Sequence, residues 1–274
     1  MSVIHSRAVA RRLTRKRAGL SSLDRRRPSA ERISGLQDTE LRRTVLTPAT
    51  TRHGIHDPTH GYATRVPPRK NAKTARGFIF FNGVKVYHES ELEHRVSLRI
   101  AVRNDVKSLH SQFPKLHYID ADGVLREHVA DFYVEYQDGL REAVLVKLEK
   151  KRKKMKELVE RIQVHENPRV VDGIQVLTEK YGTHDAAENA NMVRWFRHYH
   201  HQPDVEELLD VLRKVPGWIR FGTLLMNCKS VPRRRAAVWR LIDLGVLFSP
   251  TGEKITDLTW LGFAPEGGPT GLLG

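Results

Sequence analysis

The sequence predicts an α/β protein in which a mixed-sheet core is preceded by a basic arm and followed by a smaller, mainly helical unit. Three observations lead to this prediction. Residues 128–148 read as two strands joined by a turn at Gln137-Asp138-Gly139. An amphipathic helix is expected at 149–163, and a strand at 170–177 returns after it. The third observation is an excess of basic residues confined to the N-terminal part of the chain.

The basic excess defines the predicted N-terminal arm. Residues 1–76 hold 18 basic and 5 acidic residues, whereas residues 77–274 hold 29 and 27. The arm consists largely of Arg, Ser, Thr, Pro and Gly with few aromatic residues, so we expect it to be largely disordered. Positive charge of this density attracts a polyanion, and DNA or RNA is the simplest such partner.

Composition also limits the classes of protein to consider. Cys228 is the single cysteine of the 274 residues, which excludes an intramolecular disulfide and a cysteine-based zinc site. No run of about 18 apolar residues is present, so no membrane span is expected. These features are typical of a cytoplasmic protein.

The core is predicted to begin with a hairpin and a helix. The hairpin starts at Gly77 and turns at Asn82-Gly83, because this dipeptide supplies the positive φ angles of a type I′ turn. The helix opens at Ser90. Its apolar stripe repeats every four residues, at Leu92, Val96 and Ile100.

Strands dominate the next part of the chain. We expect them at 106–113, at 116–119 and at 124–135, with Pro114 interrupting the first pair and Ala121-Asp122-Gly123 forming the turn between the second and third.

A charged residue stands out in the following strand. Residues 143–148 are almost continuously apolar, as expected of a strand buried on both faces, yet they include Lys147. Burying an ammonium group is costly unless an anion pairs with it. Antiparallel pairing across the turn would bring Asp131 of the preceding strand close to Lys147. A mixed sheet flanked by helices, with charged residues at one edge, indicates an α/β core of the nuclease type.

The C-terminal part reads as a separate unit. After a helix at 186–200, helices are predicted at 205–215, 222–228 and 231–244, followed by a hairpin within 246–261. The order helix, helix, basic helix, hairpin is typical of a winged helix-turn-helix. The predicted DNA contacts are the basic residues of its third helix and of the helix after Lys147, namely Arg233, Arg234, Arg235, Arg240, Lys150, Lys151 and Arg152.

Five short segments together resemble a known family. They are Ser-Glu-Leu-Glu at 90–93, Gln-Phe-Pro at 112–114, His-Val-Ala-Asp-Phe at 128–132, Val-Lys at 146–147 and Val-Leu-Thr-Glu-Lys at 176–180. In this order and spacing they resemble the TnsA-like endonuclease subunit of heteromeric cut-and-paste transposases. The resemblance covers about residues 77–200. The domains are therefore expected to be the arm at 1–76, a nuclease core at 77–201, a winged helix at 202–264 and a flexible tail at 265–274.

The resemblance implies a restriction-endonuclease-like core that nicks the 5′ ends of a transposon with Mg²⁺, for which Mn²⁺ can substitute. It also implies three partners: transposon-end DNA, a TnsB-like DDE transposase and a TnsC-like AAA+ regulator. The expected location is the bacterial cytoplasm, at the nucleoid while the protein acts. Residue by residue, Glu93 would be the helix carboxylate and Asp131 the metal-binding aspartate. Lys147 would be the active-site lysine, and Val146 would offer a backbone carbonyl to the metal.

One position departs from the family's pattern. Two residues before the lysine the family has an acidic or amide side chain, and this sequence has Leu145. Residues two apart in a strand face the same side, so Leu145 is expected where an oxygen ligand should be. Three explanations stay open: the site works with fewer ligands, it takes an oxygen from elsewhere such as Glu149, or the nuclease is retired. A register shift would offer Glu149 and Lys151 as the acid–lysine pair, but both are expected in the basic helix.

The candidate site residues also have ordinary structural interpretations. Glu93 lies three residues after Ser90, which is the spacing of a helix capping box. Asp131 and Lys147 would equally suit a structural ion pair. Two functions therefore remain: a metal-dependent endonuclease subunit, and a DNA-binding assembly subunit of the same transposition complex without catalysis.

Overall fold

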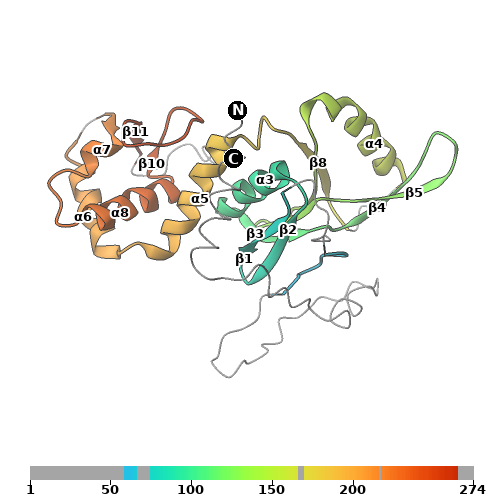
Figure 1. Ribbon diagram of the computed structural model, residues 1–274, viewed down its shortest axis with the longest axis horizontal. Coiled ribbons are helices and arrows are strands. Elements are labelled where there is room, and N and C mark those ends of the chain that lie inside the picture. The colour runs from blue at the N-terminus through green and yellow to red at the C-terminus, as the bar shows by residue number, and fades with distance from the viewer. Residues whose placement is uncertain (1–58, 67–74, 166–169, 216, 265–274) are drawn as a thin grey trace, which may run out of the picture. The chain divides into compact units, whose positions relative to one another are not determined.

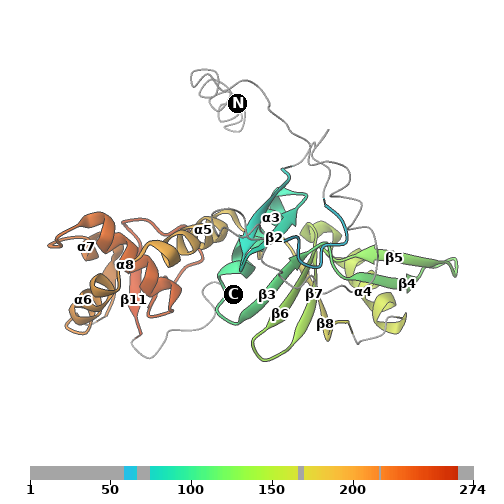
Figure 2. The same ribbon diagram turned by 90° about the horizontal axis from the view of Figure 1, so that it is seen from below.

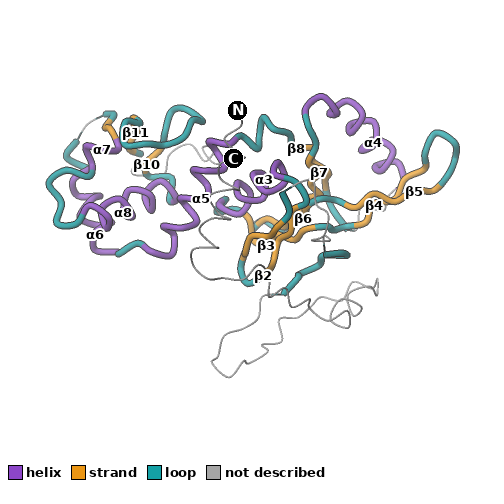
Figure 3. The backbone as a smooth tube through the Cα atoms, viewed as in Figure 1, coloured by secondary structure: helices purple, strands orange, loops and turns teal. Residues whose placement is uncertain are grey.

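A computed structural model describes residues 59–66, 75–165, 170–215 and 217–264 (Figure 1). The predicted α/β class is confirmed, and Figure 3 shows how helices and strands follow one another along the chain. The predictions for the arm before residue 59 and for the tail after residue 264 lie outside the described residues. No helix of the described part is long and apolar enough to cross a membrane.

The core begins with the predicted hairpin and helix. Strands β1 (Gly77–Phe81) and β2 (Val84–His88) pair antiparallel. Asn82 and Gly83 have φ angles of 46° and 77°, which confirms the predicted positive φ angles at this turn. Helix α3 (Glu91–Val102) follows directly, and its apolar stripe is buried as expected.

Four strands form the central sheet, in the order β3-β6-β7-β8. Strands β3 (Val106–Ser111), β6 (Phe132–Tyr136) and β7 (Arg141–Val146) are antiparallel neighbours. Strand β8 (Gly173–Leu177) runs parallel to β7. The prediction of a mixed sheet is thus confirmed, including the tight turn between β6 and β7.

One predicted strand is divided in two. Residues 124–135 were expected as a single strand, but β5 (Leu125–Val129) pairs with β4 (Lys115–Ile119) in a separate two-stranded sheet, apart from β6. The break lies opposite the stretch between β3 and β4, where Gln112 has a φ angle of 53° and Pro114 has no backbone N–H to donate. The result is a bent double strand whose bend contains Asp131.

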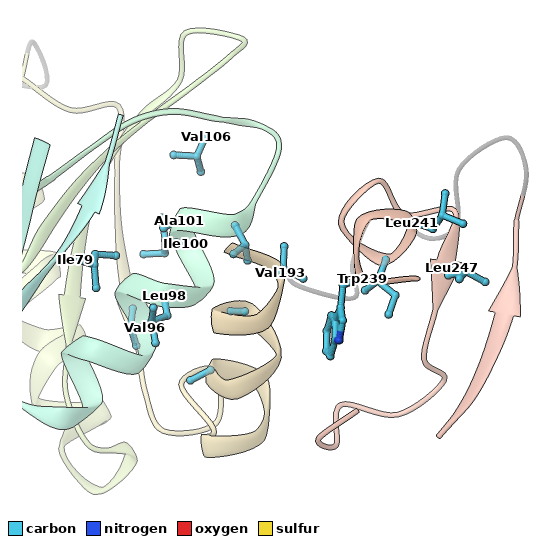
Figure 4. Packing of buried hydrophobic residues seen from close by; sticks show 14 of the residues in the cluster. Ile79, Val96, Leu98, Ile100, Ala101, Val106, Val193, Trp239, Leu241 and Leu247 are labelled. Atoms are coloured by element: carbon cyan, nitrogen blue, oxygen red, sulfur yellow. The ribbon is translucent and has the colours of Figure 1, made fainter. Parts of the chain in front are cut away.

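The alternation of β7 separates two apolar clusters. Val144 and Val146 belong to the first cluster, with α3 and helix α5 (His184–Tyr199). Figure 4 shows Val96 and Ile100 of α3 in this cluster. Ala143 and Leu145 face the second cluster, which also contains residues of helix α4 (Arg152–His165). Helix α4 follows a short 3₁₀ helix, η1 (Glu149–Lys151), so the predicted basic helix is confirmed with a tighter first turn.

The C-terminal part contains helices α6 (Gln202–Leu212), α7 (Phe221–Leu224) and α8 (Val231–Asp243). The predicted hairpin is present as β10 (Leu247–Phe248) and β11 (Trp260–Phe263), paired antiparallel. A strand that sequence analysis missed, β9 (Ile219–Arg220), pairs with β11 and completes a three-stranded sheet in the order β10-β11-β9.

Helix α5 connects the core with the C-terminal helices. Arg197 donates to Asp243 of α8 at 2.5 Å and to the carbonyl of Val102 at the end of α3 at 2.8 Å. Trp239 of α8 is buried in the first cluster. The first cluster thus continues from the sheet into α6 and α8, although the predicted domain boundary falls between α5 and α6.

Candidate active site

The bend between β5 and β6 presents Asp131 to the end of β7. The Asp131 side chain is 12% exposed, and its Oδ2 accepts a hydrogen bond from the N–H of Val146 at 2.7 Å. The same oxygen lies 3.3 Å from Nζ of Lys147, whose side chain is 30% exposed. The prediction that these two side chains lie close together is confirmed. Asp131 itself lies in the bend, whereas the prediction placed it within a strand.

The backbone N–H groups of Val146 and Lys147, at the end of β7, point to opposite edges of the strand. The N–H of Lys147 donates to the carbonyl of Leu177 on the β8 side at 3.1 Å, whereas the N–H of Val146 points toward Asp131. The N–H and C=O of one strand residue lie on the same edge of the strand. The carbonyl of Val146 is therefore directed toward the side of Asp131, where the predicted backbone ligand was placed.

Glu93 joins this group from the first turn of α3. Its residue is 8% exposed, and its carboxylate accepts hydrogen bonds from the N–H of Glu89 at 2.7 Å and from Oγ of Ser90 at 2.9 Å. The N–H of Glu93 donates to Oγ of Ser90 in return, so the capping interpretation is confirmed. Burial raises the pKa of Glu93, and the negative charge of Asp131 raises it further, while Lys147 acts in the opposite direction. The three predicted site residues therefore interact electrostatically.

His128 of β5 belongs to the same surroundings. Burial lowers its pKa, with the charge of Asp131 acting against that effect. Its Nε2 is buried and has no hydrogen-bond partner among the described residues. The unpartnered nitrogen of His128 is a feature that no sequence pattern could have revealed.

Leu145 is a core residue. Its side chain is fully buried in the second cluster, which also holds Met155 and Ile162 of α4. The Leu145 side chain points away from the first cluster. The alternation of the strand predicts the same side for Lys147, two residues further on. Position 145 thus contributes an apolar contact and no oxygen to the site.

Glu149 has basic partners in this structure, and its role as a source of the missing oxygen stays a prediction. Its carboxylate lies 3.0 Å from Nζ of Lys180 and 3.4 Å from the guanidinium of Arg152. A hydrogen bond from the Thr178 hydroxyl, followed by the Lys180 ion pair, lowers the pKa of Glu149. With Lys151 it lies in η1, beyond the end of β7, so the alternative acid–lysine pair at 149 and 151 is not part of the strand.

The predicted DNA-contacting arginines of α8 already have carboxylate partners. Arg233 bonds to Asp204 at 2.6 Å and Arg235 to Asp257 at 2.5 Å. Arg234 is buried and pairs with Glu207, and Arg240 pairs with the buried Asp243. DNA contact by these side chains stays a prediction, and for Arg234 and Arg240 it would require breaking a pair with a buried member. Lys150, Lys151 and Arg152 are exposed beside the end of β7.

The oxygen donors at the site suit a hard divalent cation, although the set of protein ligands is small. Mg²⁺ usually keeps several waters and is held by one or two carboxylates. Glu93 and Asp131 provide two, and a cation would favour the ionised form of Glu93, whose pKa burial and then the charge of Asp131 raise. No group of three or more His, Cys, Asp or Glu side chains at metal-binding spacing occurs in the described part of the chain. Any ion here would therefore depend on few protein ligands.

Sequence analysis missed a segment beside the site. Residues 59–66 were assigned to the arm, but they pack against the core. The signal was weak: Tyr62-Ala63 is an aromatic and apolar pair in an otherwise polar stretch. Its packing depends on contacts with residues about 50 positions away, such as His110, which local patterns do not report.

No family model matches this sequence, and no curated protein matches it significantly.

Proposed function

We propose that this chain is a metal-dependent DNA endonuclease subunit of a TnsA-like kind, which nicks the 5′ ends of a transposon within a heteromeric transposase. The observation that carries the proposal is the contact between Asp131 and Lys147 at the end of β7, with Glu93 electrostatically coupled to both. An acid–lysine pair at the end of a strand, next to a second carboxylate, suits the hydrolysis of a phosphodiester.

Each residue has a distinct role in this proposal. Glu93, Asp131 and the carbonyl of Val146 would hold Mg²⁺, or Mn²⁺ in its place. When bound, the ion would polarise the phosphate and make the attacking water more acidic. Lys147 keeps its ammonium group partly exposed beside Asp131, where it can steady the attacking water or the charge that develops on the phosphate.

The C-terminal elements support a DNA-binding role. The order α6, β9, α7, α8, β10, β11, with the sheet order β10-β11-β9, is compatible with a winged helix-turn-helix. The mixed sheet with helices on both faces supports the proposal of a restriction-endonuclease-like core. In this proposal the partners are transposon-end DNA, a TnsB-like DDE transposase that cuts the other strand and a TnsC-like AAA+ regulator.

Leu145 favours a second function. Leucine has no oxygen to offer two residues before the lysine and its side chain is fully buried, and Glu93 already caps α3. A chain with these properties would suit a DNA-binding assembly subunit that no longer cuts. We favour the endonuclease because Asp131 and Lys147 remain in contact at the end of β7, where the partly exposed lysine is accessible to a substrate.

Strand-specific end cleavage tests the proposal. The full chain is combined with its cognate transposase and regulator on end-labelled transposon DNA, in Mg²⁺ and in Mn²⁺. The matched pair of variants is Asp131→Asn and Asp172→Asn, since Asp172 pairs with Arg141 at the opposite end of β7. We expect 5′-strand cuts with wild type and Asp172→Asn and none with Asp131→Asn. Equal assembly by all three proteins, with cuts only by the partner transposase, would identify the assembly subunit instead.

A further inference from the structure

Residues 59–66, here named the strap, attach the end of the arm to the core. Thr59 forms a parallel bridge with Val84, in which its N–H donates to the Gly83 carbonyl at 3.0 Å and its carbonyl accepts from Lys85 at 2.7 Å. The strap is the blue segment in Figure 2, near β2. It is therefore joined to the sheet system by backbone hydrogen bonds at its beginning.

The middle of the strap packs closely against β3. The N–H of Tyr62 donates to Nδ1 of His110 at 3.3 Å, and the two rings are centred 4.2 Å apart. Gly61 has a φ angle of 61°, and a Cβ at this position would lie 2.2 Å from the His110 ring. Only glycine allows this approach, so the contact is a specific docking of the strap.

The end of the strap holds Gln112. Both the N–H and the hydroxyl of Thr64 donate to the Gln112 carbonyl, at 3.1 Å and 2.8 Å. Nε of Arg65 donates to Oε1 of Gln112 at 2.9 Å. The Arg65 guanidinium also pairs with Glu89, with Nη1 3.0 Å from Oε1. One arginine therefore connects β2's end with the bend after β3.

Arg65 contacts Gln112 and Glu89, and each of these two residues donates a backbone hydrogen bond to one of the candidate site residues. The N–H of Gln112 donates to the carbonyl of Asp131 at 2.9 Å. The N–H of Glu89 donates to the carboxylate of Glu93 at 2.7 Å. Asp131 and Glu93 come from different elements, so Arg65 is a bridge between their two supports.

We propose that Arg65 is a positioning residue that fixes Glu93 relative to Asp131, so that the strap supports the active site. This inference rests on the proposed endonuclease function. Arg65 need not touch the reacting atoms, since it acts through Glu89 and Gln112. Its side chain is 52% exposed, and an ion pair this exposed contributes little to global stability. Small displacements of catalytic groups, in contrast, reduce turnover strongly.

The test compares Arg65→Ala and Arg65→Lys with Arg126→Ala in the full chain. Arg126 is a matched control, because it forms a similarly exposed ion pair with Asp120 near the tip of the β4–β5 hairpin. For Arg65→Ala we expect the amides of Glu89 and Gln112 to exchange hydrogen about tenfold faster, by NMR. In the cleavage assay, kcat should fall about 100-fold with KM unchanged. Arg65→Lys, which keeps the charge but not the planar fork, should give intermediate values.

The outcomes separate this inference from the proposed function. Faster exchange at Glu89 and Gln112 in a protein that never cuts DNA would support the bridge and overturn the endonuclease. Unchanged exchange and unchanged kcat in Arg65→Ala, in a protein that does cut, would overturn the bridge alone. Equal effects of Arg65→Ala and Arg126→Ala on both measurements would also overturn it. Circular dichroism confirms that each variant is folded.

Discussion

Replacing Leu145 with glutamine places an oxygen-bearing side chain where the resemblance predicts an acidic or amide ligand. In this chain the leucine is 0% exposed and packs in the second cluster. Losing its apolar burial costs about 2 kcal/mol. Burying an amide without a partner adds about 1–3 kcal/mol. We therefore expect Leu145→Gln to lower the free energy of unfolding by about 3–5 kcal/mol.

Urea denaturation of the full chain measures this difference, and Leu148→Gln provides the matched control. Leu148 is 42% exposed, so the same substitution there should change the free energy of unfolding by less than about 1 kcal/mol. If Leu145→Gln and Leu148→Gln cost the same, position 145 opens toward a polar site. The placement of Leu145 in the core would then be wrong.

Three further predictions concern titration and ion pairs. Because burial and Asp131 raise the pKa of Glu93 above 4.5, the native protein binds this proton more tightly than the unfolded chain. Wild type should therefore lose unfolding free energy as pH rises above 4.5, whereas Glu93→Gln should not. Urea denaturation of both proteins across this pH range measures the difference. Burial lowers the pKa of His110 to about 4, so its neutral ring accepts the Tyr62 N–H at pH 7. That hydrogen bond and its contribution to the free energy of unfolding should be lost as pH falls from 6.5 through about 4. A Tyr62 amide NMR signal that does not change over this pH range would contradict this prediction. Arg234→Ala should lower the free energy of unfolding by about 2 kcal/mol, because the variant loses a buried side-chain stem and an ion pair. Lys151→Ala should leave stability unchanged and weaken DNA binding at low salt. Equal stability of the two variants in urea would contradict this prediction.

Features that depend on local chemistry were predictable from the sequence. Asn82-Gly83 requires positive φ angles wherever it forms a two-residue hairpin loop, and Ser90 with Glu93 satisfies a helix start by itself. Lys147 was identifiable because a charge in an apolar strand needs an anion, and Asp131 supplies it. Each of these inferences uses residues within one element or one hairpin.

Features that depend on distant partners were not predictable. The break at Asp131 lies opposite Gln112, in the stretch between β3 and β4, and no pattern within residues 124–135 predicts it. The strap is held by His110 and Gln112, about 50 residues away. The arginines of α8 looked free for DNA in the sequence, yet tertiary packing places a carboxylate beside each of them, such as Asp204 beside Arg233.

Manganese binding to the full chain tests the central claim, that Glu93 and Asp131 form an oxygen-ligand site although Leu145 supplies nothing. Electron paramagnetic resonance of added Mn²⁺ distinguishes free from bound ion. We expect a site that is filled in wild type and in Asp172→Asn and lost in Asp131→Asn. Equal Mn²⁺ binding by all three proteins, or binding by none, would contradict it and leave Asp131 and Lys147 as a structural ion pair.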